Sequence, residues 1–220
     1  ARTDTLAALT GLFNSSEISA TTPAGIYPLN VSGVLTNSNY VVESAIGGTW
    51  TVALKALTIT ANDRIKTYGD GFVFQGTEFS VVGLVNEDAV TMADLASEGS
   101  IPEANVPGGP YVISIADATG TGLENYDIQY IDGRMQVLPR GIVVLSRGGR
   151  SVAGSKPRIP GLRVKNLASF DSIAVIQGLK NRLSVTRRSP AGVYRTQIAG
   201  RLGNPNYVVI RKIRGKWRVK

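Results

Sequence analysis

The chain of 220 residues contains no cysteine and no histidine. Without cysteine, disulfides and thiolate metal or redox chemistry are excluded. Without histidine, the commonest general base and metal ligand is missing. Because most familiar catalytic arrangements need one of these residues, we expect a protein that is not an enzyme and that binds no cofactor and no metal.

Long apolar runs are also lacking. No stretch approaches the roughly 18 apolar residues that a membrane-spanning helix needs, so the sequence predicts no membrane span. The chain begins with Ala1 rather than methionine and shows no signal peptide. From these features we expect a soluble fragment or processed piece.

Acidic residues are scarce in one part of the chain only. Residues 1–138 hold 15 acidic and 5 basic side chains, a net charge of −10, whereas residues 139–220 hold 1 acidic and 19 basic side chains, a net charge of +18. A segment of such uniform sign repels itself and favours polyanionic partners. A face that served solubility alone would mix both signs.

The sequence repeats one pattern three times. Tyr27, Tyr111 and Tyr194 correspond, at separations of 84 and 83 residues, which is the length of a small domain. With 25 glycines and many β-branched residues, the pattern favours short strands joined by tight turns. We predict a mostly β chain of tandem small domains, β-grasp-like or sandwich-like, each with one short helical turn. The predicted domains are a partial repeat at 1–53, a complete repeat at 54–138 and a degenerate basic repeat at 139–220.

An aspartate stands 23 residues before each of these tyrosines, as Asp4, Asp88 and Asp171. Each is followed by a small or hydroxyl residue and an aliphatic one, a pattern typical of a helix start. We predict that the three aspartates are structural caps of the short helices DTLAAL, DAVTMADL and DSIAVI. A catalytic carboxylate is the alternative, but no acid or base partner is evident.

The rest of each repeat alternates with a period of two, which is typical of strands with one buried face. The last strand should turn Trp50 and Val52, Met135 and Val137, or Trp217 and Val219 inward. Strands opening with Asn-Tyr precede it, at Asn39, Asn125 and Asn206. Two leading strands are predicted in each of the later repeats, namely 57–59 and 79–81, then 142–144 and 162–164. The first repeat lacks them, either because it is truncated or because another chain donates strands.

Several motifs together resemble a known family. They are Thr67-Tyr-Gly-Asp70, Val82-Gly-Leu-Val-Asn-Glu-Asp88, the Gly-x-Tyr strand, the Asn-Tyr strand and the final Gly-x-x-x-Val strand. As a set they resemble the MBG domain of YGX type, a mostly β, glycine-rich repeat. In residues 139–220 the run SVAGSKP replaces the Tyr-Gly motif. The resemblance implies a tandem array in a large exported bacterial adhesin of the filamentous haemagglutinin type, secreted or held at the cell surface. It supplies no catalytic residues.

The short junctions ALKA and LPRG between repeats predict a stiff rod rather than flexible tethers. On the last strands, outward positions are Thr49 and Thr51 in the first repeat but cationic in the third, so the scaffold does not need the charge. The candidate residues for binding an anion or partner are Arg163, Lys165, Arg195, Arg211, Lys212, Arg214, Lys216, Arg218 and Lys220.

Candidate partners for this basic repeat are acidic polysaccharide, lipopolysaccharide and the acidic middle repeat of a neighbouring molecule. Self-association would then be head-to-tail, or by strand exchange. Nucleic acid ranks lower because no stacking aromatics stand among the exposed basic positions.

Two further patterns are similar to known sites. The run Gly149 to Lys156 is close to a phosphate-binding loop, but the lysine is displaced and Pro157 follows where a helix should begin; we predict an ordinary loop. Acidic residues that lie near one another in sequence leave a calcium site open as an alternative. They are Asp63, Asp70, Glu87, Asp88 and Asp94.

Overall fold

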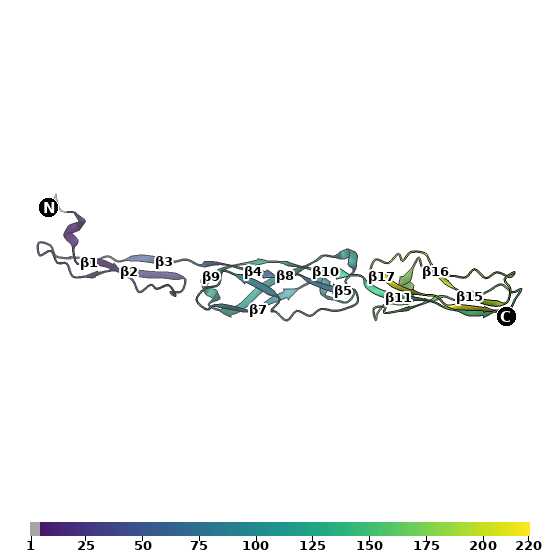
Figure 1. Cartoon of the computed structure of the whole chain (residues 1–220). Coiled ribbons are helices and arrows are strands. Elements are labelled where there is room, and N and C mark those ends of the chain that lie inside the picture. Colours follow the sequence, from purple (N-terminus) through teal and green to yellow (C-terminus); the bar gives the residue numbers. More distant parts are fainter. Residues whose placement is uncertain (1–4) are drawn as a thin grey trace. The chain divides into compact units, whose positions relative to one another are not determined.

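The computed structural model describes residues 5–220, whose strands are labelled in Figure 1. The chain divides into two compact units. The first comprises residues 1–59, 80–93 and 117–130, and the second residues 60–79, 94–116 and 131–220. The predicted mostly β class is confirmed, because every helical element described is a short 3-10 turn. No helix in residues 5–220 is long and apolar enough to cross a membrane.

The first unit holds two three-stranded sheets, with strand orders β1-β2-β3 and β6-β4-β9. Their bounds are β1 Leu12–Ser15, β2 Gly25–Gly33, β3 Gly48–Val52, β4 Lys55–Ala61, β6 Phe79–Val82 and β9 Tyr126–Ile131, together with the turns η1 Leu6–Leu9 and η4 Leu123–Asn125. Strands β2 and β3 are antiparallel, with Tyr27 opposite Trp50.

The second unit holds the sheets β13-β11-β17, β12-β18-β15 and β14-β16. It also holds β5 and β10 of the sheet β5-β10-β8-β7, whose strands β7 and β8 are each divided between the residues of the two units. The bounds before residue 139 are β5 Arg64–Thr67, β7 Ala89–Ala96, η2 Glu98–Ser100, η3 Val106–Gly108, β8 Tyr111–Thr121 and β10 Gly133–Leu138. Those after it are β11 Arg140–Ser146, β12 Gly149–Ser151, β13 Leu162–Lys165, η5 Ile173–Ile176, β14 Lys180–Arg182, β15 Gly192–Arg195, β16 Gln197–Ala199, β17 Tyr207–Ile213 and β18 Lys216–Val219.

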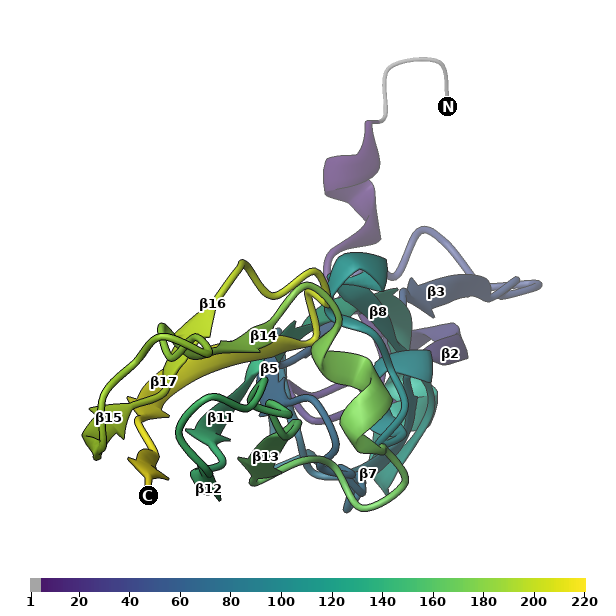
Figure 2. The same cartoon turned by 90° about the vertical axis from the view of Figure 1, so that its right-hand side faces the viewer.

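Residues 54–138 and 139–220 use the same strand pairings. The order β6-β4-β9 in the former matches β13-β11-β17 in the latter, and β5-β10-β8 matches β12-β18-β15. Of the strands in residues 139–220, Figure 2 labels β11, β12, β13, β15 and β17 among others. Tyr111 lies opposite Met135 and Tyr194 opposite Trp217, as Tyr27 lies opposite Trp50. Positions that correspond in the sequence are therefore paired in the same register.

The buried side chains follow the predicted alternation in the second and third repeats. Met135 and Val137 are buried on β10, as Trp217 and Val219 are on β18. The leading strands are also formed, and Ile142 is fully buried. One core cluster contains Tyr68, Ala104, Val137, Ile142, Val144, Leu162, Ala168, Ile176 and Tyr207, and another contains Val185, Trp217 and Val219.

The first repeat departs from the predicted core. Trp50 is 50% exposed, Val42 is exposed, and the predicted strand at residues 39–42 is not formed. In the later repeats the corresponding strands β9 and β17 lie beside β4 and β11, which are leading strands. Within residues 5–53 no strand corresponds to β4 or β11, and Trp50 remains half exposed.

The helix predicted for DAVTMADL was wrong, because these residues form strand β7 beside β8. Asn86 and Glu87 just before it take positive φ angles of 57° and 63°, which produces a turn. The Thr91 hydroxyl then donates to the carbonyl of Thr119 at 3.1 Å. Pairing with a long neighbouring strand outweighs the weak helical preference of a short segment.

The two aligned tryptophans provide a test of this difference. Because Trp217 is 2% exposed and Trp50 is 50% exposed, Trp217→Ala should lower the free energy of unfolding by about 3–5 kcal/mol, and Trp50→Ala by less than about 1 kcal/mol. Urea unfolding followed by circular dichroism measures both. Equal losses would contradict the assignment of the two environments.

Candidate functional site

The outward face of the sheet β12-β18-β15 carries a group of cations. Arg195 on β15 lies directly opposite Lys216 on β18. Arg218 lies opposite Arg150 on β12 and Val193 on β15. Directly opposite side chains on neighbouring strands point to the same face, with Cβ atoms about 5 Å apart. We call Arg150, Arg195, Lys216 and Arg218 the cationic face.

Buried neighbours orient these cations. Trp217 and Val219 alternate with Lys216 and Arg218 along β18 and are buried on the opposite side. The Trp217 indole donates its Nε1 hydrogen to the Ser151 hydroxyl at 3.1 Å. Since successive side chains of a strand point to opposite faces, anchoring the tryptophan keeps the two cations in solvent.

All nine basic residues predicted to bind an anion or partner are exposed, but they do not form one patch. Arg195, Lys216 and Arg218 share the cationic face, and Lys220 directly follows β18. The others lie on the sheet β13-β11-β17 or in the connection after β17. These are Arg163, Lys165, Arg211, Lys212 and Arg214.

On this second sheet the cations are spaced across an aliphatic strand. Lys165 and Arg211 both lie opposite Val143, one on each side of it. Arg163 lies opposite Leu145, whose neighbour on β17 is Ile213. The outward face of this sheet is therefore a mixture of single cations and aliphatic side chains, and the denser charge is on the cationic face.

Arg150 was not among the predicted residues. The run that contains it was expected to be a loop, whereas Gly149–Ser151 forms strand β12, parallel to β18. A strand of three residues is too short to show alternation. The sequence signal that could have revealed β12 is its alignment with Arg64–Thr67, the strand before the Tyr-Gly-Asp motif.

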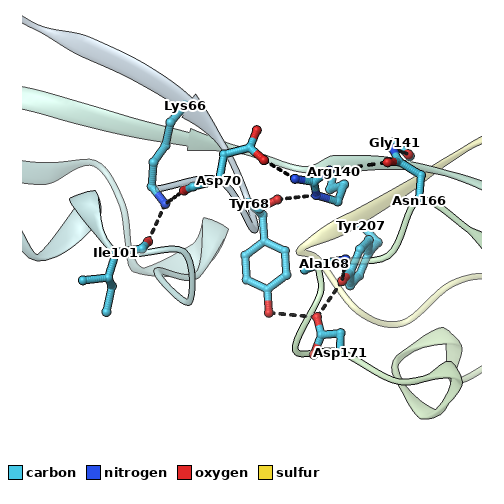
Figure 3. A network of polar contacts seen from close by, with 10 residues as sticks. All are labelled: Lys66, Tyr68, Asp70, Ile101, Arg140, Gly141, Asn166, Ala168, Asp171 and Tyr207. Carbon is cyan, nitrogen blue, oxygen red and sulfur yellow. Dashed lines mark hydrogen bonds and ion pairs between the residues drawn. The ribbon is translucent and has the colours of Figure 1, made fainter. Parts of the chain in front are cut away.

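Asp171 is the single acidic residue of the third repeat, and it does not neutralise the cations. Its Oδ2 accepts hydrogen bonds from the Tyr207 hydroxyl at 2.5 Å and the Tyr68 hydroxyl at 3.1 Å (Figure 3). Tyr68 belongs to the middle repeat and Tyr207 to the third. One carboxylate thus bonds the two repeats together at the junction of residues 138 and 139.

The tyrosine rings are packed as well as hydrogen-bonded. Tyr68 meets Tyr207 edge-on at a centroid distance of 5.4 Å, and meets Phe170 edge-on at 5.9 Å. Such pairs contribute about 0.5–1.5 kcal/mol beyond their buried area. The hydroxyl of Tyr207 also accepts the backbone hydrogen of Ala168 at 3.1 Å.

Arg140 makes a second set of contacts at the same junction. It opens β11 and donates from Nε to the carbonyl of Tyr68 at 2.7 Å, and its Nη2 forms an ion pair with Asp70 (Figure 3). Lys66 holds the turn from within the middle repeat, donating to the carbonyls of Asp70 at 2.8 Å and Ile101 at 2.5 Å. The residues of the Tyr-Gly-Asp motif are therefore contacts to the next repeat.

Glycine is required between the two side chains of that motif. Gly69 has φ of +87°, and a Cβ there would come within 2.7 Å of the Ala168 Cβ and 3.0 Å of the Arg140 Nε. Both atoms belong to the third repeat, so its close approach leaves no space for a side chain.

The predicted capping role of the aspartates was wrong. The turn η5 is capped by Ser172, whose hydroxyl accepts the Ala174 backbone hydrogen, while Asp171 binds the tyrosines. No helix follows Asp88; its carboxylate accepts the Tyr126 hydroxyl at 2.8 Å. Asp4 lies outside the described residues, and Thr5 caps η1. In η1 and η5 the hydroxyl residue that follows the aspartate occupies the N-cap position.

The middle and third repeats thus share one arrangement. Tyr126 bonds Asp88 and accepts the Val85 backbone hydrogen at 2.9 Å, as Tyr207 bonds Asp171 and accepts that of Ala168. The Asn-Tyr asparagines also correspond: Asn125 accepts the Ala24 backbone hydrogen at 2.8 Å, and Asn206 accepts that of Val106 at 2.9 Å. In each case an asparagine binds a loop of the preceding repeat.

Burial and the Asp171 carboxylate alter tyrosine acidity at the junction. Burial, then the hydrogen bond to Asp171, raises the pKa of Tyr207 to about 12. The same causes raise the pKa of Tyr68. Both hydroxyls therefore remain protonated donors throughout the physiological pH range. Burial of the Lys66 ammonium lowers its pKa.

The acidic residues considered for calcium do not assemble into a site. Within residues 5–220, no group of three or more acidic side chains could hold a metal ion. Asp70 and Asp88 are instead engaged by Arg140 and Tyr126.

A comparison with protein families finds one match, over residues 57–136. The matching family is the MBG domain (YGX type). This confirms the resemblance recognised in the sequence, and the MBG match covers the middle repeat with its Tyr68-Gly69-Asp70 turn. A search of curated proteins finds no match to the chain.

Tyr207→Phe tests the junction. The variant loses the bond to Asp171 and leaves the Ala168 backbone hydrogen without its partner, so the free energy of unfolding of residues 139–220 should fall by about 1–3 kcal/mol. Tyr27→Phe is the matched control, because its hydroxyl bonds an exposed carbonyl, that of Pro23, and should cost less than about 1 kcal/mol. Chemical denaturation measures both, and equal losses would rule out a special role for Tyr207.

The junction should also weaken at alkaline pH. The Tyr207 pKa is raised from 10 to about 12 on folding, so its stabilisation is complete below pH 10 and is lost as the pH rises toward 12. Denaturation between pH 9 and 12 should show a steeper loss of stability for the natural chain than for Tyr207→Phe, in which other titrating groups are unchanged. Parallel curves would contradict this linkage.

Proposed function

We propose that the chain is a structural and adhesive module of an exported bacterial surface protein, in which the basic third repeat attaches to acidic polysaccharide. The single observation that carries the proposal is the cationic face, where four cations from three adjacent strands lie opposite one another and form no ion pair with an acidic side chain of residues 5–220. Directly opposed like charges destabilise a sheet. A polyanion would remove that repulsion on binding.

The MBG match supports the structural part of the proposal. A β repeat bonded to its neighbour through a carboxylate, two tyrosines and an arginine is suited to holding a binding surface in a fixed position. The joint between the middle and third repeats lies within one compact unit. It supports the predicted stiffness at that junction.

Polysaccharide is favoured over nucleic acid by what surrounds the cations. The uncharged outward neighbours are aliphatic, namely Val193 beside the cationic face and Val143 and Leu145 on the other sheet. Phe170 is exposed but packs against Tyr68. Binding to single-stranded nucleic acid gains most of its base contacts from stacking aromatics, whereas a polysaccharide of uronic or sulfated sugars needs only anionic contacts and apolar sugar faces.

Removing the cationic face tests this function. A chain in which Arg150, Arg195, Lys216 and Arg218 are replaced by glutamine should bind polygalacturonate at least about tenfold more weakly, since exposed ion pairs contribute about 0.2–1 kcal/mol each. Isothermal titration at low and high salt measures the affinity, with single-stranded DNA and polyphosphate as competing probes.

The control variant removes the same charge elsewhere. Arg158, Arg187, Arg188 and Arg201 are exposed and lie outside the cationic face, and their replacement by glutamine should have a smaller effect. An equal loss of affinity in both variants would show that binding depends on net charge alone and not on the cationic face. Preference for DNA over polygalacturonate would overturn the choice of ligand.

A second candidate function, assembly by strand exchange between copies, rests on the first repeat. Its apolar side chains Phe13, Ile26 and Trp50 are exposed, although Met135 and Trp217, which align with Trp50, are buried. An added strand from another copy would cover them. Light scattering of the full chain across salt concentrations distinguishes the two modes of self-association. Strand exchange gives oligomers that persist at high salt, whereas head-to-tail attraction between the basic third repeat and the acidic middle repeat gives oligomers that dissociate. A monomer at all salt concentrations excludes both modes.

A further inference from the structure

Two turns at the ends of the middle and third repeats have the same backbone. The residue pairs Lys66–Val137 and Ser151–Val219 occupy the same position in the parallel pairs β5–β10 and β12–β18. Two residues beyond, Tyr68 donates its backbone hydrogen to the Leu138 carbonyl at 2.9 Å. Ala153 donates to the carbonyl of the chain's last residue, Lys220, at 2.7 Å.

The agreement continues through the turn. Asp70 donates its backbone hydrogen to the Thr67 carbonyl at 3.0 Å, and Ser155 donates to that of Val152 at 3.1 Å. Between them, Gly69 and Gly154 have φ angles of +87° and +82°. Position by position, Ala153 stands where Tyr68 stands, Gly154 matches Gly69, and Ser155 matches Asp70.

The side chains of the two turns differ where the first makes its contacts. Tyr68 binds Asp171 and packs on Tyr207, and Asp70 pairs with Arg140. Alanine and serine at the matching positions offer neither an aromatic ring nor a carboxylate. In the described chain nothing lies within 4 Å of the position that a Cβ on Gly154 would take, and Val152 is 67% exposed.

The partner side of the contact also repeats. Arg140 is the first residue of β11, and Lys55 is the first residue of β4. Asp88 and Tyr126 are bonded as Asp171 and Tyr207 are. The middle repeat therefore carries a cation, a carboxylate and a tyrosine at the positions with which the third repeat binds the Tyr-Gly-Asp turn.

We propose that the Tyr-Gly-Asp turn is a docking surface whose partner is the leading edge of a further repeat of the same kind, and that the turn at residues 152–155 is its inactive counterpart. A following repeat would not be bound through the turn at residues 152–155.

The docking role of the Tyr-Gly-Asp turn can be tested in the full chain. The double variant Tyr68→Ala/Asp70→Ser converts it to the sequence type of the inactive turn. Amide exchange at Ala168, whose hydrogen is bound to the Tyr207 hydroxyl, should accelerate at least about tenfold, because two contacts to charged groups are lost. The matched control Ala153→Tyr/Ser155→Asp should leave this exchange rate unchanged. An unchanged rate in Tyr68→Ala/Asp70→Ser would overturn the docking role.

The inactive turn requires a longer chain. A second copy of residues 139–220 is appended after Lys220, so that its Pro139 follows Lys220 as Pro139 naturally follows Leu138. In one version the original turn at residues 152–155 is kept, and in the other it carries Ala153→Tyr/Ser155→Asp. In each version Arg140 of the appended copy is then changed to alanine, and Ala168 exchange in that copy is measured.

With the restored turn, Arg140→Ala in the appended copy should accelerate that exchange severalfold, because the arginine has an aspartate to bind. With the original turn, the same change should have no effect. A response of equal size in both versions would show that the original turn docks a successor, and no response in either would show that Tyr and Asp are not what the surface requires. Either result would refute the proposal.

Discussion

The shared carboxylate of Asp171 is the interaction on which the arrangement of the second and third repeats depends. Two tyrosine hydroxyls from different repeats converge on one oxygen of a half-buried carboxylate, and their hydrogen bonds replace part of its lost hydration. The surrounding rings exclude water and strengthen those bonds. Arg140 and Asp70 form the second contact, so the joint is held at two points.

The side chains that support the fold and those that set the surface charge occupy different positions on each strand, so the same fold can carry either an acidic or a basic surface. Inward positions on β10 and β18 are filled by equivalent large side chains, Met135 and Trp217, which support the same strand register. Outward positions are free to vary because water surrounds them. The middle repeat uses this freedom for an acidic surface, and the third repeat for a basic one, with no change in strand order. The outward charge and the joint can therefore be altered independently.

Most strands and their buried faces could be predicted from the sequence, because the three repeats show up to three aligned residues at each position. Alternation along the strands identified the buried faces, and the spacing of the tyrosines identified which positions correspond between the repeats. The failures have local causes. A two-turn helix and a strand have similar patterns over eight residues, so DAVTMADL was assigned wrongly; only its pairing with β8 decides the matter.

The aspartates were recognised as equivalent but given the wrong partner, because a bond to a tyrosine some 38 residues away has no local signature. The role of the Tyr-Gly-Asp turn was hidden for the same reason, since its partners come from the following repeat. Trp50 was predicted to be buried because it aligns with Met135 and Trp217, but an alignment does not show whether neighbouring strands cover the side chain, and Trp50 is half exposed.

The connection at Pro139 has a mechanical consequence. Strand β10 ends at Leu138 and β11 begins at Arg140, so a single residue joins them. A tether of one residue has no slack to extend under tension. A pulling force along the chain would pass directly into the strand ladders on either side, where several hydrogen bonds must break together before the chain lengthens. The junction between the two repeats is therefore a link that resists stretching rather than one that yields gradually.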